Sequence, residues 1–317
     1  MPNYRTGLRP LLAAAIAACL VAPATAQEAW YPSKYGAADT LGAVNNLSPE
    51  GVKRAVGLVK LGKVYALGVP TGPQSAVYGD RKYTAEILPG PGVVTPPLGE
   101  NKVTAHDERV TTSMGIGTQM DGLAHLGIDH RYYNGLTGAE LNTAQGFKTL
   151  DLSNVPPLVT RGVVIDMVRH FGKPMTAGQA FNRPEIQAAM RAQKVTIGKG
   201  DVVLFHTGWM AAKMNSDRAA FQATQPGLGE DGAIWLADQG VVAIGADTIA
   251  LEHIPFANEN RPFVVHQTLL AKKGVHIFEN VNVGLLAADG VSEFLFVLGQ
   301  PRFVGTVQVV INPIAIR

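Results

Sequence analysis

Cysteine is nearly absent from this sequence: Cys19 is the only one among 317 residues. It lies in residues 1–26, an N-terminal segment that we predict to be a signal peptide removed after Ala26. A mature chain beginning at Gln27 then holds no cysteine, which excludes disulfides, thiolate metal ligands and a cysteine nucleophile. Such a protein depends on its hydrophobic core, together with any metal or oligomer contacts that it makes.

The N-terminal segment has the parts of a secretory signal peptide. Arg5 and Arg9 give it a basic start, Leu11 to Val21 is apolar, and Ala24 to Ala26 forms a small-residue cleavage site. We therefore predict that the mature protein is periplasmic or secreted. The alternative is a lipoprotein-type cleavage that leaves a lipid-anchored Cys19, but the apolar run continues past this residue.

Neither an excess of basic residues nor a long apolar run follows this segment. The chain carries 27 basic and 25 acidic residues, and two of its arginines lie in the leader, so the remainder is formally neutral. The absence of basic clusters argues against a nucleic-acid partner, and no later stretch is apolar enough for a transmembrane span. We expect residues 27–317 to form one domain that acts on a small-molecule substrate.

Several catalytic motifs are also missing. There is no G-x-S-x-G nucleophile elbow, and no H-E-x-x-H zinc helix, Walker A loop or G-x-G-x-x-G turn. These absences argue against a serine enzyme of the α/β-hydrolase type, against nucleotide chemistry and against Rossmann-type redox chemistry.

From Gly162 onward, strand and helix patterns alternate. Short apolar runs predict buried strands, and runs that begin with proline or end at glycine predict helices. The expected strands are 63–69, 162–166, 201–205, 241–245, 275–278, 294–298 and 304–311, and the expected helices are 49–59, 184–193, 230–239 and 262–273. This order predicts an α/β fold, a single domain with one mixed sheet. The segment 70–105 is rich in proline and glycine and predicts a long loop, which is either a lid or oligomer contact or, equally well, a mobile insertion.

The densest group of potential ligands lies between Gly117 and His125. Gln119, Asp121 and His125 place a carboxamide, a carboxylate and an imidazole within seven residues, and the glycines allow the backbone to bend around an ion. Such oxygen and nitrogen donors suit a metal such as zinc or manganese. From the spacing alone, an ordinary hydrogen-bonded turn explains the stretch equally well.

A second pair of polar residues lies near the C-terminal end. His266 begins the last expected helix, and Glu279 follows the next strand. A tight turn at Gly274 returns the strand along the helix, which would bring the two side chains together. From spacing alone, an exposed histidine and a surface carboxylate remain the simpler interpretation.

Taken together, these segments resemble the Putative cyclase family of metal-dependent hydrolases, which includes bacterial kynurenine formamidases and isatin hydrolases. The usual signature of that family is H-x-G-T-H-x-D-x-P-x-H, and residues 115–125 are G-I-G-T-Q-M-D-G-L-A-H. Gly115, Gln119 and Leu123 thus replace two histidines and the proline. Further matches are T-G-W at 207–209, G-x-D-T at 245–248, H-x-x-L-L at 266–270 and E-N at 279–280.

The resemblance implies a swivelling β/β/α domain that binds zinc or manganese and is usually a homo-oligomer, a dimer or a tetramer. It assigns one metal ion to Asp121, His266 and Glu279, with Gln119 as a fourth ligand or a water-orienting group. It makes His125 the general acid/base. The replaced histidines remove the two-histidine half of a dinuclear site.

The function that follows from the resemblance is hydrolysis of an amide or lactone, which can be cyclic. The metal polarises the carbonyl and lowers the pKa of water, and His125 moves the proton. We expect His206, Trp209, Asp247 and Glu252 to line the substrate pocket. Two alternatives stay open: a non-hydrolytic metal-dependent cyclase or dehydratase, and an exported binding protein that has lost catalysis.

Overall fold

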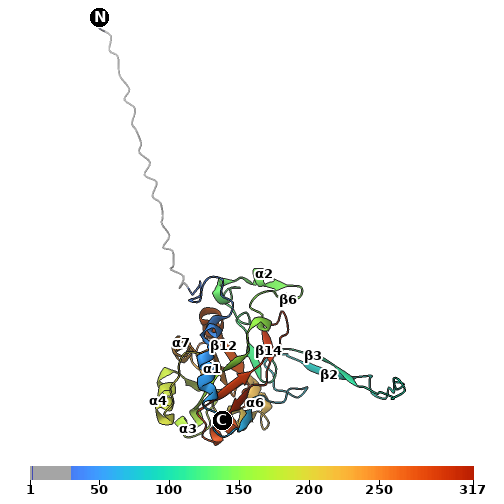
Figure 1. Cartoon of the computed structure of the whole chain (residues 1–317). Coiled ribbons are helices and arrows are strands. Elements are labelled where there is room, and N and C mark those ends of the chain that lie inside the picture. Colours follow the sequence, from blue (N-terminus) through green and yellow to red (C-terminus); the bar gives the residue numbers. More distant parts are fainter. Residues whose placement is uncertain (1, 3–29) are drawn as a thin grey trace.

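A nine-stranded mixed sheet forms the centre of the molecule (Figure 1). The computed structural model describes residue 2 and residues 30–317. The predicted cleavage site and nearly all of the predicted signal peptide therefore lie outside the described residues. Across the sheet, the strand order is β1 (Val64–Ala66), β15 (Ile314–Ile316), β13 (Glu293–Leu298), β7 (Leu158–Asp166), β9 (Val202–His206), β11 (Ala243–Ala246), β12 (His276–Glu279), β4 (Gln119–Asp121) and β14 (Gln308–Val310).

The central strands β7, β9, β11 and β12 run parallel, and the strands beyond them on both sides pair antiparallel. Parallel neighbours need crossover connections, which here contain helices. The helices are α1 (Pro49–Val56), α2 (Gly138–Leu141), α3 (Met167–Phe171), α4 (Arg183–Gln193), α5 (Trp209–Lys213), α6 (Arg218–Ala223), α7 (Glu230–Asp238), α8 (Val264–His266) and α9 (Gly284–Ala288), with the π-helical segment η4 (Gln267–Lys273) directly after α8. This confirms the predicted mixed α/β fold.

Within residues 30–317, no helix has both the length and the apolar character that crossing a bilayer requires.

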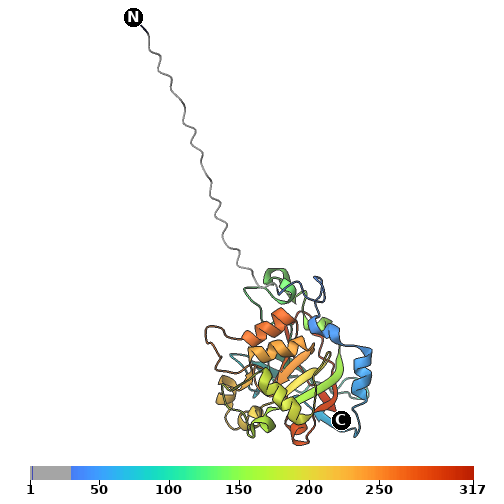
Figure 2. The same cartoon turned by 90° about the vertical axis from the view of Figure 1, so that its left-hand side faces the viewer.

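Each face of the sheet packs into its own hydrophobic cluster. Along β7, Val163 and Ile165 belong to one cluster, whereas Val164 belongs to the other, as the alternation of side chains along a strand requires. Helices α4 and α7 and segment η4 cover the first face (Figure 2). The second cluster fills the inside of the curled sheet, where Tyr65 of β1 and Phe278 of β12 are both buried.

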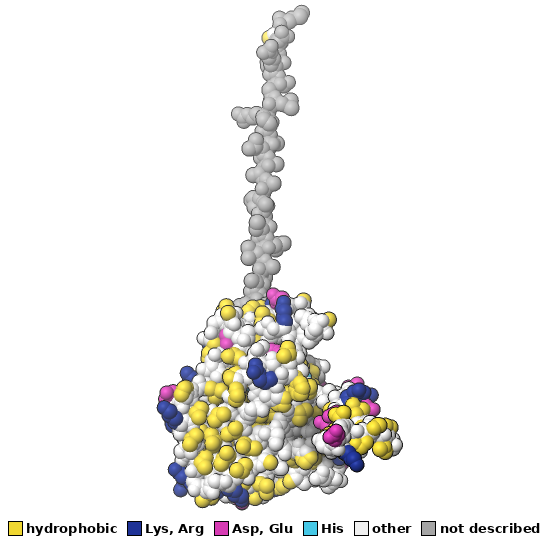
Figure 3. Space-filling model, turned by 45° about the vertical axis from the view of Figure 1, so that its right-hand side comes forward, with side chains coloured by type: hydrophobic (Ala, Val, Ile, Leu, Met, Phe, Trp, Pro, Cys, Tyr) yellow, Lys and Arg dark blue, Asp and Glu magenta, His cyan; other side chains and the backbone are white. Residues whose placement is uncertain are grey.

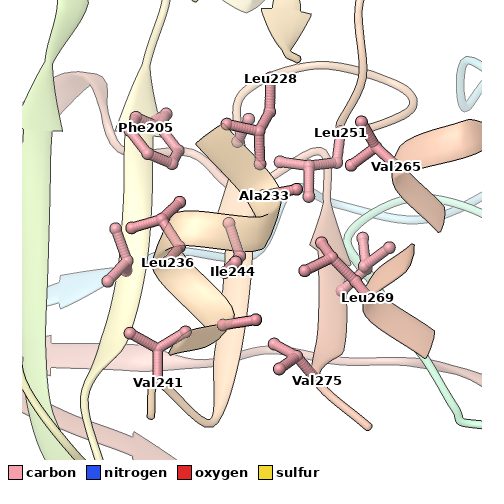
Figure 4. Packing of buried hydrophobic residues seen from close by; sticks show 14 of the residues in the cluster. Phe205, Leu228, Ala233, Leu236, Val241, Ile244, Leu251, Val265, Leu269 and Val275 are labelled. Carbon is pink, nitrogen blue, oxygen red and sulfur yellow. The ribbon is translucent and has the colours of Figure 1, made fainter. Parts of the chain in front are cut away.

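Helix α7 shows why this arrangement follows from the sequence. Its Ala233 and Leu236 point at Ile244 of β11, and Leu269 of η4 packs from the neighbouring crossover (Figure 4). Fully burying side chains of this size stabilises the fold by about 1.5–3 kcal/mol each. Since the predicted helices 184–193 and 230–239 carry the matching apolar positions, the structure confirms both within a residue at each end.

The remaining strands form three small two-stranded sheets: β2 (Tyr83–Leu88) with β3 (Asp107–Thr112), β5 (Asn142–Thr143) with β6 (Gly146–Phe147), and β8 (Ala180–Phe181) with β10 (Gly227–Leu228). Short 3₁₀ helices η1 (Gly42–Asn46), η2 (Tyr133–Gly135) and η3 (Leu152–Asn154) occupy loops. The pair β2–β3 is an arm that projects from the body (Figures 1 and 3). We use the name arm for residues 83–112.

The predicted long loop at 70–105 is therefore partly wrong. Residues Tyr83 to Leu88 pair antiparallel with β3, which satisfies their backbone groups away from the body. Residues 70–82 and the tip between the two strands are irregular, and Val94 at the tip is 91% exposed. His106, which precedes β3, and the first β3 residues Asp107 to Arg109 are exposed, and Arg109 pairs with Glu86 across the arm.

Strand β12 contains His276, a buried histidine whose protonation is unfavourable in the folded protein. The Nδ1 of His276 lies 3.1 Å from the carbonyl oxygen of Asp121, to which it donates when it carries hydrogen. Its Nε2 is buried and has no hydrogen-bond partner in the described part of the chain. Burial lowers the pKa of His276 from 6.5 to about 4, so the folded protein keeps this ring neutral.

We expect the free energy of unfolding to fall as the pH drops from 6.5 towards 4, because the unfolded chain binds a proton on His276 that the folded chain refuses. The loss approaches about 1.4 kcal/mol per pH unit. Urea denaturation at pH 7.5 and pH 5 measures it: His276→Gln should lose less stability over this interval than the parent protein, whereas the exposed control His130→Gln should behave as the parent. Identical pH dependence in all three proteins would contradict this assignment.

Candidate metal centre

The candidate site begins on β4, which is a buried strand rather than the bend that we predicted. Gln119 pairs with Glu279 of β12, and Asp121 pairs with Ile277. Because side chains alternate along a strand, Gln119, Asp121 and Glu279 share one face, while Met120 points into the opposite cluster. The backbone of β4 is extended because it is paired on both sides, by β12 and by β14.

Two residues at the edges of these strands fix the pairing. The Thr118 hydroxyl donates to the carbonyl oxygen of Asn280 at 2.6 Å, and the Asn280 amide donates to the carbonyl oxygen of Gly117 at 2.9 Å. Gly117 has a φ of +63°, and a Cβ there would lie 2.0 Å from the Thr71 hydroxyl. The glycine before the strand is therefore needed for both its conformation and its close approach to a neighbouring loop.

His266 enters from the helix that covers this face. Its Nε2 lies 3.1 Å from Glu279 Oε1 and 3.6 Å from Asp121 Oδ2. The turn at Gly274 thus returns β12 beside the start of the helix, as the spacing suggested. The expected helix at 262–273 is α8 followed by the π-helical η4, and single π turns are frequent at functional sites.

Glu252 holds the other side of the His266 ring. Its Oε1 accepts from the His266 backbone N–H at 3.0 Å and lies 2.8 Å from His266 Nδ1. A carboxylate that binds one ring nitrogen fixes the imidazole so that the other nitrogen faces the site. We had placed Glu252 in the substrate pocket. The structure corrects this, because Glu252 is 2% exposed and lies behind the histidine.

Three carboxyl groups surround the imidazole of His266. Burial alone would lower the pKa of His266, but contacts with Asp121, Glu252 and Glu279 raise it well above 6.5. Burial and the charge of Asp121 raise the pKa of Glu279 above its usual range. Burial also opposes ionisation of Asp121, yet the imidazoles of His125 and His266 hold its pKa below its usual range. Three carboxyl groups around one imidazole favour a bound cation.

The donor set fits a divalent metal ion. Ligand atoms of Asp121, His266 and Glu279 all lie within 4.8 Å of one another, and all three residues are buried. Asp121 Oδ2 is fully enclosed and has no hydrogen-bond partner among the described residues. An orphaned carboxylate oxygen is costly unless a ligand occupies the space beside it. Two carboxylates and an imidazole are ligands that zinc and manganese accept.

Two glutamine amides secure the carboxylates. Gln119 Nε2 donates to Asp121 Oδ1 at 3.3 Å and also donates to Glu279 Oε2. From β14, Gln308 Nε2 donates to Asp121 Oδ1 at 2.7 Å. In this arrangement, Gln119 acts as a hydrogen-bond donor to two candidate ligands, which favours an orienting role over ligation by its oxygen.

A cavity of about 180 Å³ opens beside this cluster. His266 and Glu279 line it, and His125 lies at its wall with Nε2 4.0 Å from Asp121 Oδ2. Its other lining residues are Tyr78, Arg81, Leu126, Ile249, Ala250 and Phe263. Sequence reasoning missed Arg81 and Gln308, since a lone arginine in a loop and a glutamine in a strand carry no recognisable pattern.

The other predicted pocket residues lie elsewhere. His206 and Asp247 line a separate cavity of about 660 Å³, and Trp209 packs in a small apolar cluster with Ile249. Asp247 accepts from the backbone N–H groups of Thr207 and Gly208, so it fixes the turn after β9. None of these three side chains lines the cavity beside His266.

Together, the curled mixed sheet and a buried Asp-His-Glu cluster define an α/β protein with a candidate metal centre. The Putative cyclase profile matches residues 59–253, so the chain belongs to that family. This match includes β4 but ends before His266 and Glu279. A comparison with curated protein sequences found no match.

Solved structures share the fold over most of the chain. A crystal structure described as a novel cyclase is 28% identical, with a TM-score of 0.81 over 90% of this chain and 96% of that one. Isatin hydrolase A from Labrenzia aggregata is 16% identical, with a TM-score of 0.61 over 82% of this chain and 94% of that one. A predicted metal-dependent hydrolase from Bacillus stearothermophilus is 20% identical, with a TM-score of 0.54 over 80% of this chain and 97% of that one.

The variant Asp121→Asn should lose most of its bound metal after loading with Zn²⁺ or Mn²⁺ and dialysis, because the neutral amide keeps the shape but not the charge of the carboxylate. Elemental analysis measures the metal, and circular dichroism checks the fold. Asp107→Asn on the exposed arm is the matched control and should bind metal as the parent does. A full metal complement in Asp121→Asn would refute the ligand assignment.

Proposed function

We propose that this protein is a metal-dependent hydrolase that cleaves an amide or lactone bond in a small molecule. The observation that carries the proposal is Asp121 Oδ2, which has no hydrogen-bond partner within residues 30–317 and lies near His266 and His125, both of which line the small cavity. Membership of the cyclase family and the fold shared with isatin hydrolases support the same chemistry.

Asp121, His266 and Glu279 would hold the ion, either zinc or manganese. When bound, a divalent ion supplies Lewis acidity, which polarises a carbonyl group and lowers the pKa of water. Gln119 and Gln308 keep the two carboxylates in place, and Glu252 keeps His266 Nε2 turned towards them. These contacts reduce the reorganisation that ion binding requires.

His125 is the proposed general acid/base. Burial lowers the pKa of its imidazole, against the opposing pull of Asp121. At neutral pH the ring is therefore uncharged and free to accept a proton from the attacking water. It can then return the proton to the leaving nitrogen or oxygen, which lies within reach because His125 forms part of the cavity wall.

The same cluster is also compatible with two alternative functions: a metal-dependent cyclase or dehydratase, and an exported binding protein. A neutral imidazole beside the cluster favours catalysis over simple binding, since a binding protein has less need of a proton acceptor there. Metal binding without turnover of formanilides, lactones or isatin would favour the alternatives.

We expect His125→Ala to lower kcat by about 10²–10⁴-fold on the best substrate of that panel while the metal content stays unchanged. Removing the proton carrier leaves Asp121, His266 and Glu279 in place, so catalysis and metal binding should separate. His130→Ala, an exposed histidine five residues on, is the control and should retain full activity. Unchanged turnover in His125→Ala would rule out this role.

We also propose that the mature protein is exported and assembles as a homo-oligomer. The basic, apolar and small-residue parts of residues 1–26 support export, and the exposed Val94 and Leu98 on the arm support contact with a second copy. N-terminal sequencing of the mature protein should begin at Gln27, and light scattering should give a mass above that of one chain. A retained leader would contradict export, and a monomeric mass would contradict oligomerisation.

A further inference from the structure

Arg81 is the one guanidinium group that lines the cavity beside the candidate metal centre. It is partly buried, and within residues 30–317 it makes no hydrogen bond or ion pair to another side chain. Arg161, in contrast, binds both Asp201 and Glu293. An arginine that is held against a cavity without a protein partner has its donors available for a ligand.

We infer, on the basis of the hydrolase function proposed above, that the Arg81 guanidinium binds a carboxylate group of the substrate. The substrates are then small amides or lactones that carry a carboxylate, rather than neutral ones. A guanidinium presents a planar fork of N–H donors that matches the two oxygens of a carboxylate.

The position of Arg81 is set by the sequence around it. It immediately precedes Lys82, whose backbone N–H donates to the Ser113 hydroxyl at 3.1 Å and whose carbonyl oxygen accepts from the Ser113 N–H at 2.8 Å. These bonds close the root of the arm. Gly115, two residues beyond Ser113, leaves the space that the guanidinium uses: a Cβ at Gly115 would lie 2.8 Å from Arg81 Cζ.

The same cavity would otherwise repel an anion. Asp121 and Glu279 contribute two carboxyl groups, and Glu252 lies directly behind His266. With a divalent cation held by Asp121, His266 and Glu279, and with Glu252 also ionised, the site would keep one net negative charge, which the charge of Arg81 balances. Arg81 lines the same small cavity as His125, His266 and Glu279, so its charge lies beside the candidate metal centre. A substrate carboxylate would therefore enter a site whose negative charge is balanced by the bound cation and Arg81.

The rest of the wall is apolar and limits the size of the ligand. Tyr78 and Phe263 meet edge to face with ring centroids 5.7 Å apart, and Leu126 and Ile249 complete the lining. A cavity of about 180 Å³ is smaller than a typical drug-sized pocket. The expected ligand is thus a small organic acid with an apolar or aromatic part.

Benzoate and its neutral analogue benzamide test this inference by isothermal titration calorimetry on the full protein, both in EDTA and after loading with Zn²⁺. The parent protein should bind benzoate more tightly than benzamide. Arg81→Gln should weaken benzoate binding by about tenfold or more, as expected for a lost charge-assisted hydrogen bond, and should leave benzamide binding unchanged. Arg81→Lys, which keeps the charge but not the fork, should lie between them.

The matched control is Arg218→Gln, since Arg218 is exposed and lines the separate larger cavity. It should bind benzoate as the parent does. Three results would each overturn the inference. Arg81→Gln could bind benzoate as tightly as the parent, Arg218→Gln could lose benzoate binding, or the parent could bind benzoate and benzamide equally well. Benzoate binding that depends on Arg81, without turnover of any lactone or amide, would refute the hydrolase proposal alone. Turnover of neutral substrates that is unaffected by Arg81→Gln would refute this inference alone.

Discussion

The antiparallel pairing of β4 with β12 is the constraint on which the candidate site depends. It places Gln119 opposite Glu279, although 160 positions separate them in the chain. The alternation of side chains then puts Asp121 on the same face, and the helix that covers this face brings His266 to both carboxylates. Four polar residues from three elements thus meet in a buried place because backbone hydrogen bonds, rather than their own attraction, hold the strands together.

Burial gives this cluster its chemistry. In water, three carboxyl groups and an imidazole would interact weakly. Here the imidazoles lower the pKa of Asp121 and the carboxylates raise that of His266, both against the effect of burial, whereas burial and the charge of Asp121 raise the pKa of Glu279. An enclosed carboxylate oxygen without a partner adds to this cost. A divalent cation would relieve both, and the surrounding amides and Glu252 hold the ligands ready for it. The fit of these donors to a divalent cation is the physical argument for a functional role.

The chain departs from the family signature at positions 115 and 119, and the structure shows what fills the space. Gln119 donates to two carboxylates where relatives are expected to carry a histidine, and Gly115 makes room for Gln308 and Arg81. The amides of Gln119 and Gln308 and the guanidinium of Arg81 thus surround these two positions. The two substitutions are coupled to residues in a loop and in a late strand, so neither can be interpreted from the motif alone.

The sequence by itself determined the alternating elements from Gly162 onward, because their apolar periodicity and their proline and glycine boundaries are local signals. It also singled out Asp121, His125, His266 and Glu279, although only as two separate groups. Tertiary structure decided that Gln119–Asp121 is a strand, that Glu252 lies behind His266, that His206 and Asp247 face another cavity, and that Arg81 faces this one. These facts depend on register and on the packing of distant segments, and no local pattern of residues encodes either.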